Sequence, residues 1–169
     1  MKQTLYRGMI GSLLYLIASK LDISFSVGVC ARYQLDPKES HLSSIKRIIC
    51  YVNGTSNYGI WYSFDTNASL VGFSDADWAA NCDDKKSTLG GCFFLRNNLV
   101  SWFCKKQNSI SLSTAKAKYI AAGSGCTQFL WMKQMLVDYG FNQGTLTLFY
   151  DIMSAINISK NPEIGRAHV

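Results

Sequence analysis

Apolar residues recur with helical spacing along the first third of the chain. Residues 5–19 are apolar nearly all round, and residues 23–33 form a second apolar stretch. From Ser40 to Val52 apolar residues return every three or four positions, which is typical of an amphipathic helix. Because Ser40 is a good helix cap and Gly54 a good helix end, the pattern predicts three helices.

The pattern changes after the third helix, where short apolar runs are separated by turns. Strand-like runs occupy residues 58–62, 70–75, 90–95, 99–104 and 146–150, and a short helical run follows at 154–159. A long helical stretch, capped by Ser113 or Thr114 and ended by Gly140, precedes the last strand. Gly123 and Gly125 are expected to break or bend this helix. The order of elements predicts an α/β fold.

Two aspartates end apolar strands in this second region. Val71 and Phe73 share one face of a strand that Asp75 continues, and Asp151 directly follows the last strand. If these strands are parallel neighbours with a right-handed crossover, both carboxylates meet at one end of the sheet. Such a pair forms the core of a divalent-metal site, because hard cations prefer oxygen ligands. The alternative is that Asp75 and Asp77 simply begin a turn.

Composition narrows the possible classes of protein. The 169 residues are 48% apolar, which suffices for a packed core and excludes a disordered chain. The net charge of +6 permits a polyanionic partner such as nucleic acid. Lys46 and Arg47 lie off the apolar stripe, either solvated or in contact with phosphate. The six cysteines form no C-x-x-C pair, so free thiols are expected rather than a zinc site.

The N-terminal apolar run permits two interpretations. Residues 9–18 follow Lys2 and Arg7, as the apolar part of a signal peptide follows its basic part. A buried helix explains the run equally well. The run is shorter than the roughly 20 residues that span a bilayer, so no membrane association is expected.

Six short motifs occur in order in the second region. They are residues 74–79, 84–88, 100–102, 105–107, 113–115 and 119–122. This ordered series resembles the ribonuclease H domain of copia-type LTR retrotransposon Pol polyproteins. Residues 6–16 and 22–23 resemble the segment that closes the reverse transcriptase region of the same polyproteins. The N-terminal run then becomes an interior helix of an intracellular polyprotein, rather than a secretion signal.

The resemblance implies a ribonuclease H-like mixed sheet flanked by helices, preceded by a small helical segment. Residues 1–57 correspond to a helical remnant of the reverse transcriptase, and residues 58–169 to the ribonuclease H-like domain. Such enzymes hydrolyse the RNA strand of an RNA–DNA hybrid with two Mg²⁺ ions, held by Asp, Glu, Asp and Asp. The implied partners are a hybrid or other nucleic acid and the rest of the polyprotein.

The family's site residues are only partly present. The first and third carboxylates fall on Asp75 and Asp151, but Lys118 stands where the family has glutamate. The fourth falls beyond the match, because residues 164–169 do not resemble the family, so the domain is expected to be truncated at its C-terminus. Lys118 either pairs with both aspartates or turns outward. Lys116 also replaces a glutamate, one that would complete a capping box.

These substitutions leave three functional hypotheses open. The ancestral activity is Mg²⁺-dependent hydrolysis of a hybrid, impaired here by Lys118 and the missing fourth carboxylate. A second hypothesis is a catalytically inactive module that still binds nucleic acid, and a third is a decayed fragment without a molecular role. Nucleic-acid contacts are expected from Lys85, Lys86, Trp102, Lys105 and Lys106.

Overall fold

The structure is a computed structural model that describes residues 3–64, 69–79, 85–151, 156–157 and 160. The chain divides into two compact units, Met1–Trp61 and Tyr62–Val169. The predicted boundary, between residues 57 and 58, falls in the irregular segment that joins them. Each unit has hydrophobic clusters of its own, so each is described by itself.

The first unit consists of three helices, as predicted. They are α1 (Gln3–Leu16), α2 (Ser24–Ala31, after a short 3₁₀ turn at Leu21–Ile23) and α3 (Glu39–Gly54). The core of this unit comprises Tyr6, Ile10, Leu13, Ile23, Val27, Cys30, Ile45 and Ile48. The prediction that Ser40 caps α3 is wrong. The cap is Lys38, whose backbone N–H donates a hydrogen bond to Nδ1 of His41.

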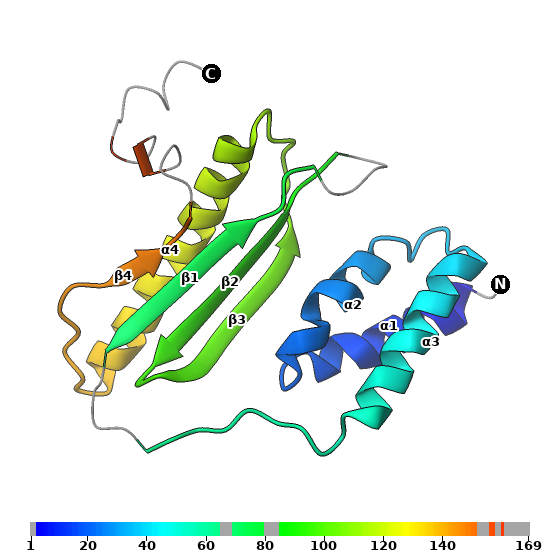
Figure 1. Cartoon of the computed structure of the whole chain (residues 1–169), viewed down its shortest axis with the longest axis horizontal. Helices are drawn as coiled ribbons and strands as arrows, with labels where there is room; N and C mark the ends of the chain where they lie inside the picture. Colours follow the sequence, from blue (N-terminus) through cyan, green and yellow to red (C-terminus); the bar gives the residue numbers. More distant parts are fainter. Residues whose placement is uncertain (1–2, 65–68, 80–84, 152–155, 158–159, 161–169) are drawn as a thin grey trace. The chain divides into compact units, whose positions relative to one another are not determined.

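The second unit is built on a four-stranded mixed sheet in the order β3-β2-β1-β4 (Figure 1). The strands are β1 (Leu70–Ala76), β2 (Thr88–Leu95), β3 (Asn98–Lys106) and β4 (Thr147–Phe149). β2 pairs antiparallel with both β1 and β3, and β4 pairs parallel with β1. This arrangement confirms the predicted mixed sheet of a ribonuclease H-like fold, including the parallel placement of β4.

The strand predicted at residues 58–62 is not formed. Residues 58–64 have no regular secondary structure, and Tyr58, Trp61 and Phe64 are exposed. Near this segment the N–H of Ser63 donates to Oδ1 of Asn98 at 2.7 Å, and Nδ2 of Asn98 donates back to the Ser63 carbonyl. The backbone groups of Ser63 therefore bond to the side chain of Asn98, the first residue of β3, and not to the backbone of a strand. A local aromatic pattern does not reveal this.

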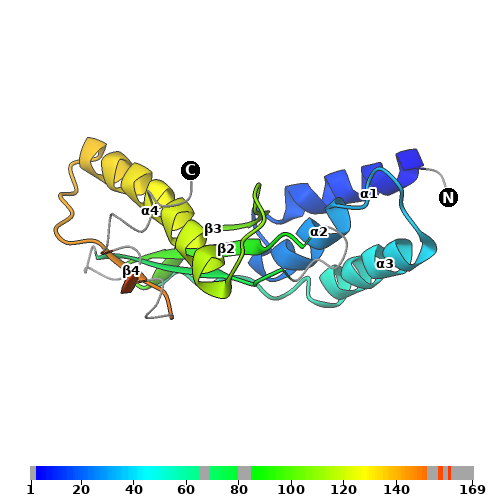
Figure 2. The ribbon, with the colours of Figure 1, turned by 90° about the horizontal axis from the view of Figure 1, so that it is seen from above.

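Helix α4 (Thr114–Asp138) connects β3 to β4 and covers one face of the sheet (Figures 1 and 2). Its N-cap is Ser113, as predicted, with Oγ accepting the backbone N–H of Lys116 at 3.2 Å. The core between helix and sheet contains Leu70, Ala76, Leu89, Phe93, Ala117, Ala121 and Phe129. Because strand side chains alternate, Phe73 and Asp75 belong to the opposite face.

The prediction that the two glycines break or bend α4 is wrong as far as a break is concerned. The helix continues through Gly123 and Gly125. A Cβ added at Gly125 would lie 3.3 Å from Cβ of Ser74 on β1, whereas one at Gly123 would meet nothing within 4 Å. Gly125 therefore lets the helix approach the sheet closely, and tertiary packing compensates for its poor helix propensity.

Substitutions at these glycines are expected to have opposite effects on stability. Gly123→Ala should raise the free energy of unfolding by up to about 1 kcal/mol, because alanine is the better helix former and space is open. Gly125→Val should lower it by about 1–3 kcal/mol, because the added methyl groups collide with Ser74 and Leu148. Urea unfolding followed by circular dichroism measures both. Equal stability of the two variants would contradict the close approach.

The expected C-terminal elements lie largely outside the described residues. Of the helix predicted at residues 154–159, only 156 and 157 are described, and they are helical. Residues 161–169, where truncation was expected, lie entirely outside the described part. None of the described helices has both the length and the apolar content needed to cross a membrane.

Candidate functional site

The parallel pairing of β1 and β4 brings the two predicted aspartates together. Val71 pairs with Thr147 and Phe73 with Phe149, so continuing the same register by two residues places Asp151 beside Asp75. Both carboxylates therefore lie at the same end of the sheet. This confirms the expectation that the two strands are parallel neighbours.

Lys118, in the second turn of α4, bridges these two aspartates. Its Nζ lies 3.0 Å from Oδ1 of Asp75 and 2.5 Å from Oδ1 of Asp151. Its side chain is only 10% exposed, whereas the aspartate side chains are 71% and 70% exposed. Of the two expected orientations, the inward one is therefore observed, and the ammonium group holds both carboxylates.

This bridge changes the protonation behaviour of the groups that form it. The hydrogen bond to Asp151 raises the pKa of Lys118 although burial acts in the opposite direction, and Asp75 contributes to the rise. The same hydrogen bond lowers the pKa of Asp151. Lys118 and Asp151 are therefore both charged near neutral pH.

The pKa shifts predict a specific pH dependence of stability. The lowered pKa of Asp151 contributes stability above its usual value of 3.8, which is lost as the pH falls through the folded-state pKa. The raised pKa of Lys118 contributes stability below its usual 10.5, which is lost as the pH rises through the folded-state pKa. The unfolding free energy of the parent minus that of Lys118→Met should therefore be constant near neutral pH. Below about pH 4 this difference should change in favour of the variant, because the parent loses the stability that the charged Asp151 contributes.

Urea titrations at several pH values measure that difference. Lys116→Met serves as the control, because Lys116 is exposed on the same helix. A parent–variant difference for Lys118 that stays constant down to pH 2 would contradict the bridge.

The residues of the site do not fit a pair of divalent cations. A cation shared by Asp75 and Asp151 would lie where both carboxylates already contact the Lys118 ammonium. In the described part of the chain, no three His, Cys, Asp or Glu side chains gather closely enough to hold a metal ion. Two carboxylates and an ammonium group supply too little negative charge for two dications.

Asp77 has a structural place instead. Its Oδ1 accepts the backbone N–H of Thr88, and its own N–H donates to the Thr88 carbonyl at 3.2 Å. Asp77 therefore fixes the end of the β1–β2 pairing. Asp77 therefore bonds to the β2 backbone, whereas Asp75 contributes to the ion-pair bridge.

Gln107 positions the start of α4 and was not singled out from the sequence. Its buried side chain donates to the carbonyl of Ala117 at 2.9 Å and accepts the Ser111 hydroxyl at 2.6 Å. Its backbone N–H donates to the Ser87 carbonyl at 2.9 Å. These bonds tie β3 and the loop before β2 to the turn that carries Lys118. In the sequence, its position in the Lys-Lys-Gln motif was the feature that could have pointed to this role.

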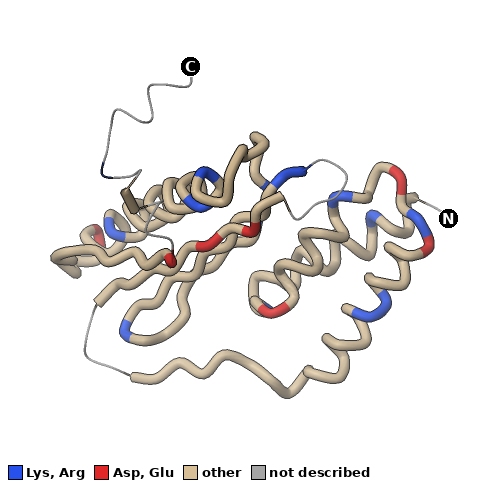
Figure 3. Tube along the Cα trace, turned by 45° about the horizontal axis from the view of Figure 1, so that its top comes forward, with Lys and Arg blue, Asp and Glu red and all other residues tan. Residues whose placement is uncertain are grey.

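The four predicted lysines gather at one end of the β2–β3 hairpin. Lys105 pairs with Leu89 and Lys106 with Thr88, and Lys85 and Lys86 directly precede that end of β2. The neighbouring residue pair toward β1 is Asp75 with Gly90, so this end of the hairpin lies at the same end of the sheet as Asp75. Figure 3 shows basic segments there and at the opposite, turn end of the hairpin.

The same residues do not all share one face. Lys105 lies over the ring of Phe103, 5.2 Å from its centroid, on the side of the sheet that α4 covers. Lys106 and Trp102 belong by alternation to the opposite side. Lys86 donates through Nζ to the Asn108 carbonyl at 2.8 Å. The predicted nucleic-acid residues therefore surround the end of the hairpin rather than line a single flat surface.

Comparison with known proteins reveals clear relatives. The retrovirus-related Pol polyprotein from transposon RE1 of Arabidopsis thaliana is 35% identical over 160 residues. The one from transposon TNT 1-94 of Nicotiana tabacum is 34% identical over 157 residues. These matches cover 94% and 92% of this chain, which spans only 11% and 12% of the polyproteins.

A third relative is much shorter. The secreted RxLR effector protein 161 of Plasmopara viticola is 34% identical over 133 residues, which are 78% of this chain and 94% of that protein. No protein-family model matches the chain. No solved structure matches it either.

Proposed function

Because this chain belongs to the copia-type, retrovirus-related Pol polyproteins of transposons, we propose that its second unit is a ribonuclease H-like domain with an ion-paired, non-hydrolytic site. Its ancestral activity is Mg²⁺-dependent hydrolysis of the RNA strand of an RNA–DNA hybrid. The observation that carries the proposal is the contact of one ammonium group with two carboxylates at 3.0 and 2.5 Å.

The chemistry of the bridge argues against hydrolysis. A general base must be unprotonated near neutral pH so that it can accept a proton from water. The hydrogen bond to Asp151 raises the pKa of Lys118 and keeps its ammonium group protonated. The two carboxylates are neutralised in part by the same ammonium group, so their attraction for dications is weakened. None of the three groups is therefore suited to activate a water molecule in the parent chain.

The decisive experiment is a cleavage assay on a labelled RNA–DNA hybrid with Mg²⁺ or Mn²⁺. The parent, Lys118→Glu and Lys116→Glu are compared, because both variants change the charge equally on neighbouring turns of α4. We expect no metal-dependent cleavage by the parent or by Lys116→Glu, and at most weak cleavage by Lys118→Glu. Metal-dependent cleavage by the parent that Asp75→Asn abolishes would overturn the proposal.

A second candidate function is nucleic-acid binding without catalysis. The four lysines at the hairpin end favour it, because phosphate contacts by lysines supply sequence-independent affinity. Salt-dependent binding of an uncleaved hybrid, with a smaller salt dependence after all four lysines are changed to alanine, would support this candidate. An unchanged dependence would exclude a contact of these lysines with phosphate.

A further inference from the structure

The face of the sheet that α4 leaves uncovered carries an aromatic side chain on every strand. These residues are Phe73 on β1, Phe94 on β2, Trp102 on β3 and Phe149 on β4, and we call them the aromatic face. We propose that the aromatic face binds single-stranded nucleic acid by stacking its bases. This inference goes beyond the proposed function, because it requires neither the Lys118 bridge nor a hybrid.

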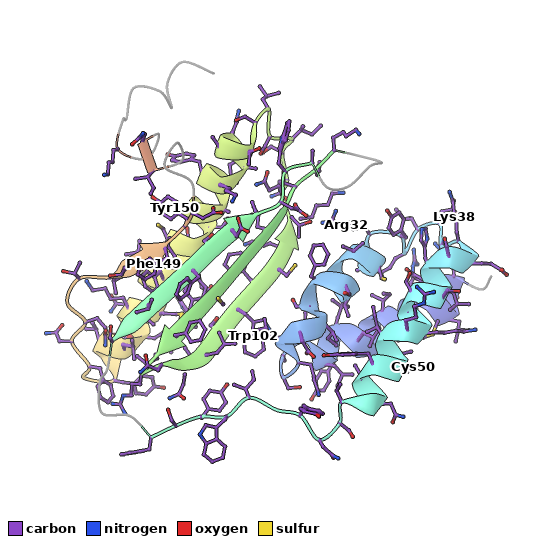
Figure 4. The ribbon with its side chains drawn as sticks, viewed as in Figure 1. Arg32, Lys38, Cys50, Trp102, Phe149 and Tyr150 are labelled. Carbon is purple, nitrogen blue, oxygen red and sulfur yellow. The ribbon has the colours of Figure 1, made fainter. Side chains whose placement is uncertain are left out.

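The pairing register places three of these four residues in one row across the sheet. Phe149 pairs with Phe73, Phe73 with Cys92, and Cys92 with Trp102, so one row crosses all four strands. Figure 4 labels Phe149 beside β4 and Trp102 beside β3. The rings of Phe73 and Phe149 are stacked, with centroids 5.2 Å apart and planes 21° apart. The row therefore already contains a short aromatic stack, which additional flat rings can extend.

Both rings of this stack are partly exposed. Phe73 is 44% exposed and Phe149 50% exposed, although both lie on strands with a packed opposite face. The ring of Phe94 meets Phe73 edge to face, at 5.8 Å and 86°. Because both rings are partly exposed, an incoming ligand can contact them directly. Each base that stacks on such a ring contributes about 1–3 kcal/mol.

Charge identifies nucleic acid as the partner. Basic residues lie at both ends of the hairpin that carries part of the aromatic face, with Arg96 in the β2–β3 turn and Lys106 at the far end of β3 (Figure 3). The eight residues of β2 span about 26 Å, the length of about four extended nucleotides. A strand laid along the hairpin meets positive charge at each end and aromatic rings between. The net charge of +6 favours the same polyanion.

A single strand fits this surface better than a duplex. In a duplex the bases stack on one another and turn only their edges outward, so flat rings on a sheet cannot reach base faces. In a single strand the bases are free to turn toward the aromatic rings while the phosphates meet the flanking basic residues. The expected preference is therefore for unpaired RNA or DNA, with little dependence on sequence.

The test measures binding of the full chain to a fluorescein-labelled oligo(U) of about 12 nucleotides by fluorescence anisotropy, within the usual range of site sizes. Phe149→Ala should weaken binding about fivefold or more, since one stacked base is lost. Phe149→Leu keeps an apolar side chain at the sheet edge but removes the ring. This variant should therefore fold, and it should bind oligo(U) as weakly as Phe149→Ala does. Phe149→Trp should bind at least as well as the parent.

Trp131→Ala is the matched control, because Trp131 is an exposed aromatic residue on α4 and lies off the aromatic face. It should leave the affinity unchanged, and because the assay needs neither a divalent metal nor a hybrid, its outcome is independent of the proposed function. Parent-like binding by a folded Phe149→Leu variant would overturn the inference. So would a parent that does not bind oligo(U) but sediments as a dimer that Phe149→Ala dissociates, because a second copy would then cover the face.

Discussion

Replacement of Lys118 by glutamate is expected to make the stability of the second unit depend on Mn²⁺. The substitution removes the ammonium that bridges Asp75 and Asp151 and adds a third carboxylate at the same end of the sheet. Two unit charges 4 Å apart in water interact by about 1 kcal/mol. Because a two-unit change acts on a dication, the affinity for Mn²⁺ should rise on the order of a hundredfold even after screening by salt.

The measurement is thermal unfolding at increasing Mn²⁺ concentration, with calorimetric titration of the folded protein. A ligand present at a hundred times its dissociation constant stabilises the folded state by about 2.7 kcal/mol. Without metal, Lys118→Glu should be less stable than the parent, because three carboxylates then repel one another. Lys116→Glu carries the same charge change at an exposed position and should not acquire metal-dependent stability. Equal Mn²⁺ responses of the two variants would show that the effect is one of net charge and not of the site.

Phe93→Ala is expected to unfold the second unit while the three helices of the first stay folded. Phe93 is fully buried, and its ring centroid lies 5.7 Å from that of Phe129 on α4 and 6.1 Å from that of Phe103 on β3. Removal of a buried phenylalanine ring costs about 3–5 kcal/mol, which is a large part of the stability of a typical domain. No residue of the core of the first unit belongs to the cluster around Phe93.

Hydrogen exchange resolved along the chain measures this difference directly. Amide protection should be lost in α4 and β1–β3 of Phe93→Ala and kept in α1–α3. Ile10→Ala is the complementary variant, because Ile10 is fully buried in the first unit and should affect only the helices. Simultaneous loss of protection in both units in either variant would show that they fold as one cooperative body.

Local pattern was sufficient for most of the secondary structure. Helical periodicity predicted α1–α3, and alternating apolar residues with turns between them predicted β1, β2 and β3. A connection through one long helix allowed β4 to be expected parallel to β1, and the structure shows that pairing. The common end of the sheet for Asp75 and Asp151 followed from that assumption.

The failed predictions share one physical cause, which is that propensity is local and packing is not. The aromatic residues at 58–62 have high strand propensity, but a strand forms only where a partner accepts its hydrogen bonds. Gly125 is a poor helix former, but the helix tolerates it because the missing side chain makes room for Ser74. In both places the deciding contact comes from a residue distant in the sequence.

The sequence by itself therefore indicated most of the elements, and it indicated the meeting of the two aspartates once their strands were taken as parallel neighbours. Only the tertiary structure decided that Lys118 points inward, because that orientation depends on two carboxylates placed by separate strands and on a flexible side chain. It also revealed the row formed by Phe73, Trp102 and Phe149, since register fixes which side chains of different strands become neighbours. Side-chain periodicity assigns a residue to a face, but strand pairing selects its neighbours on that face.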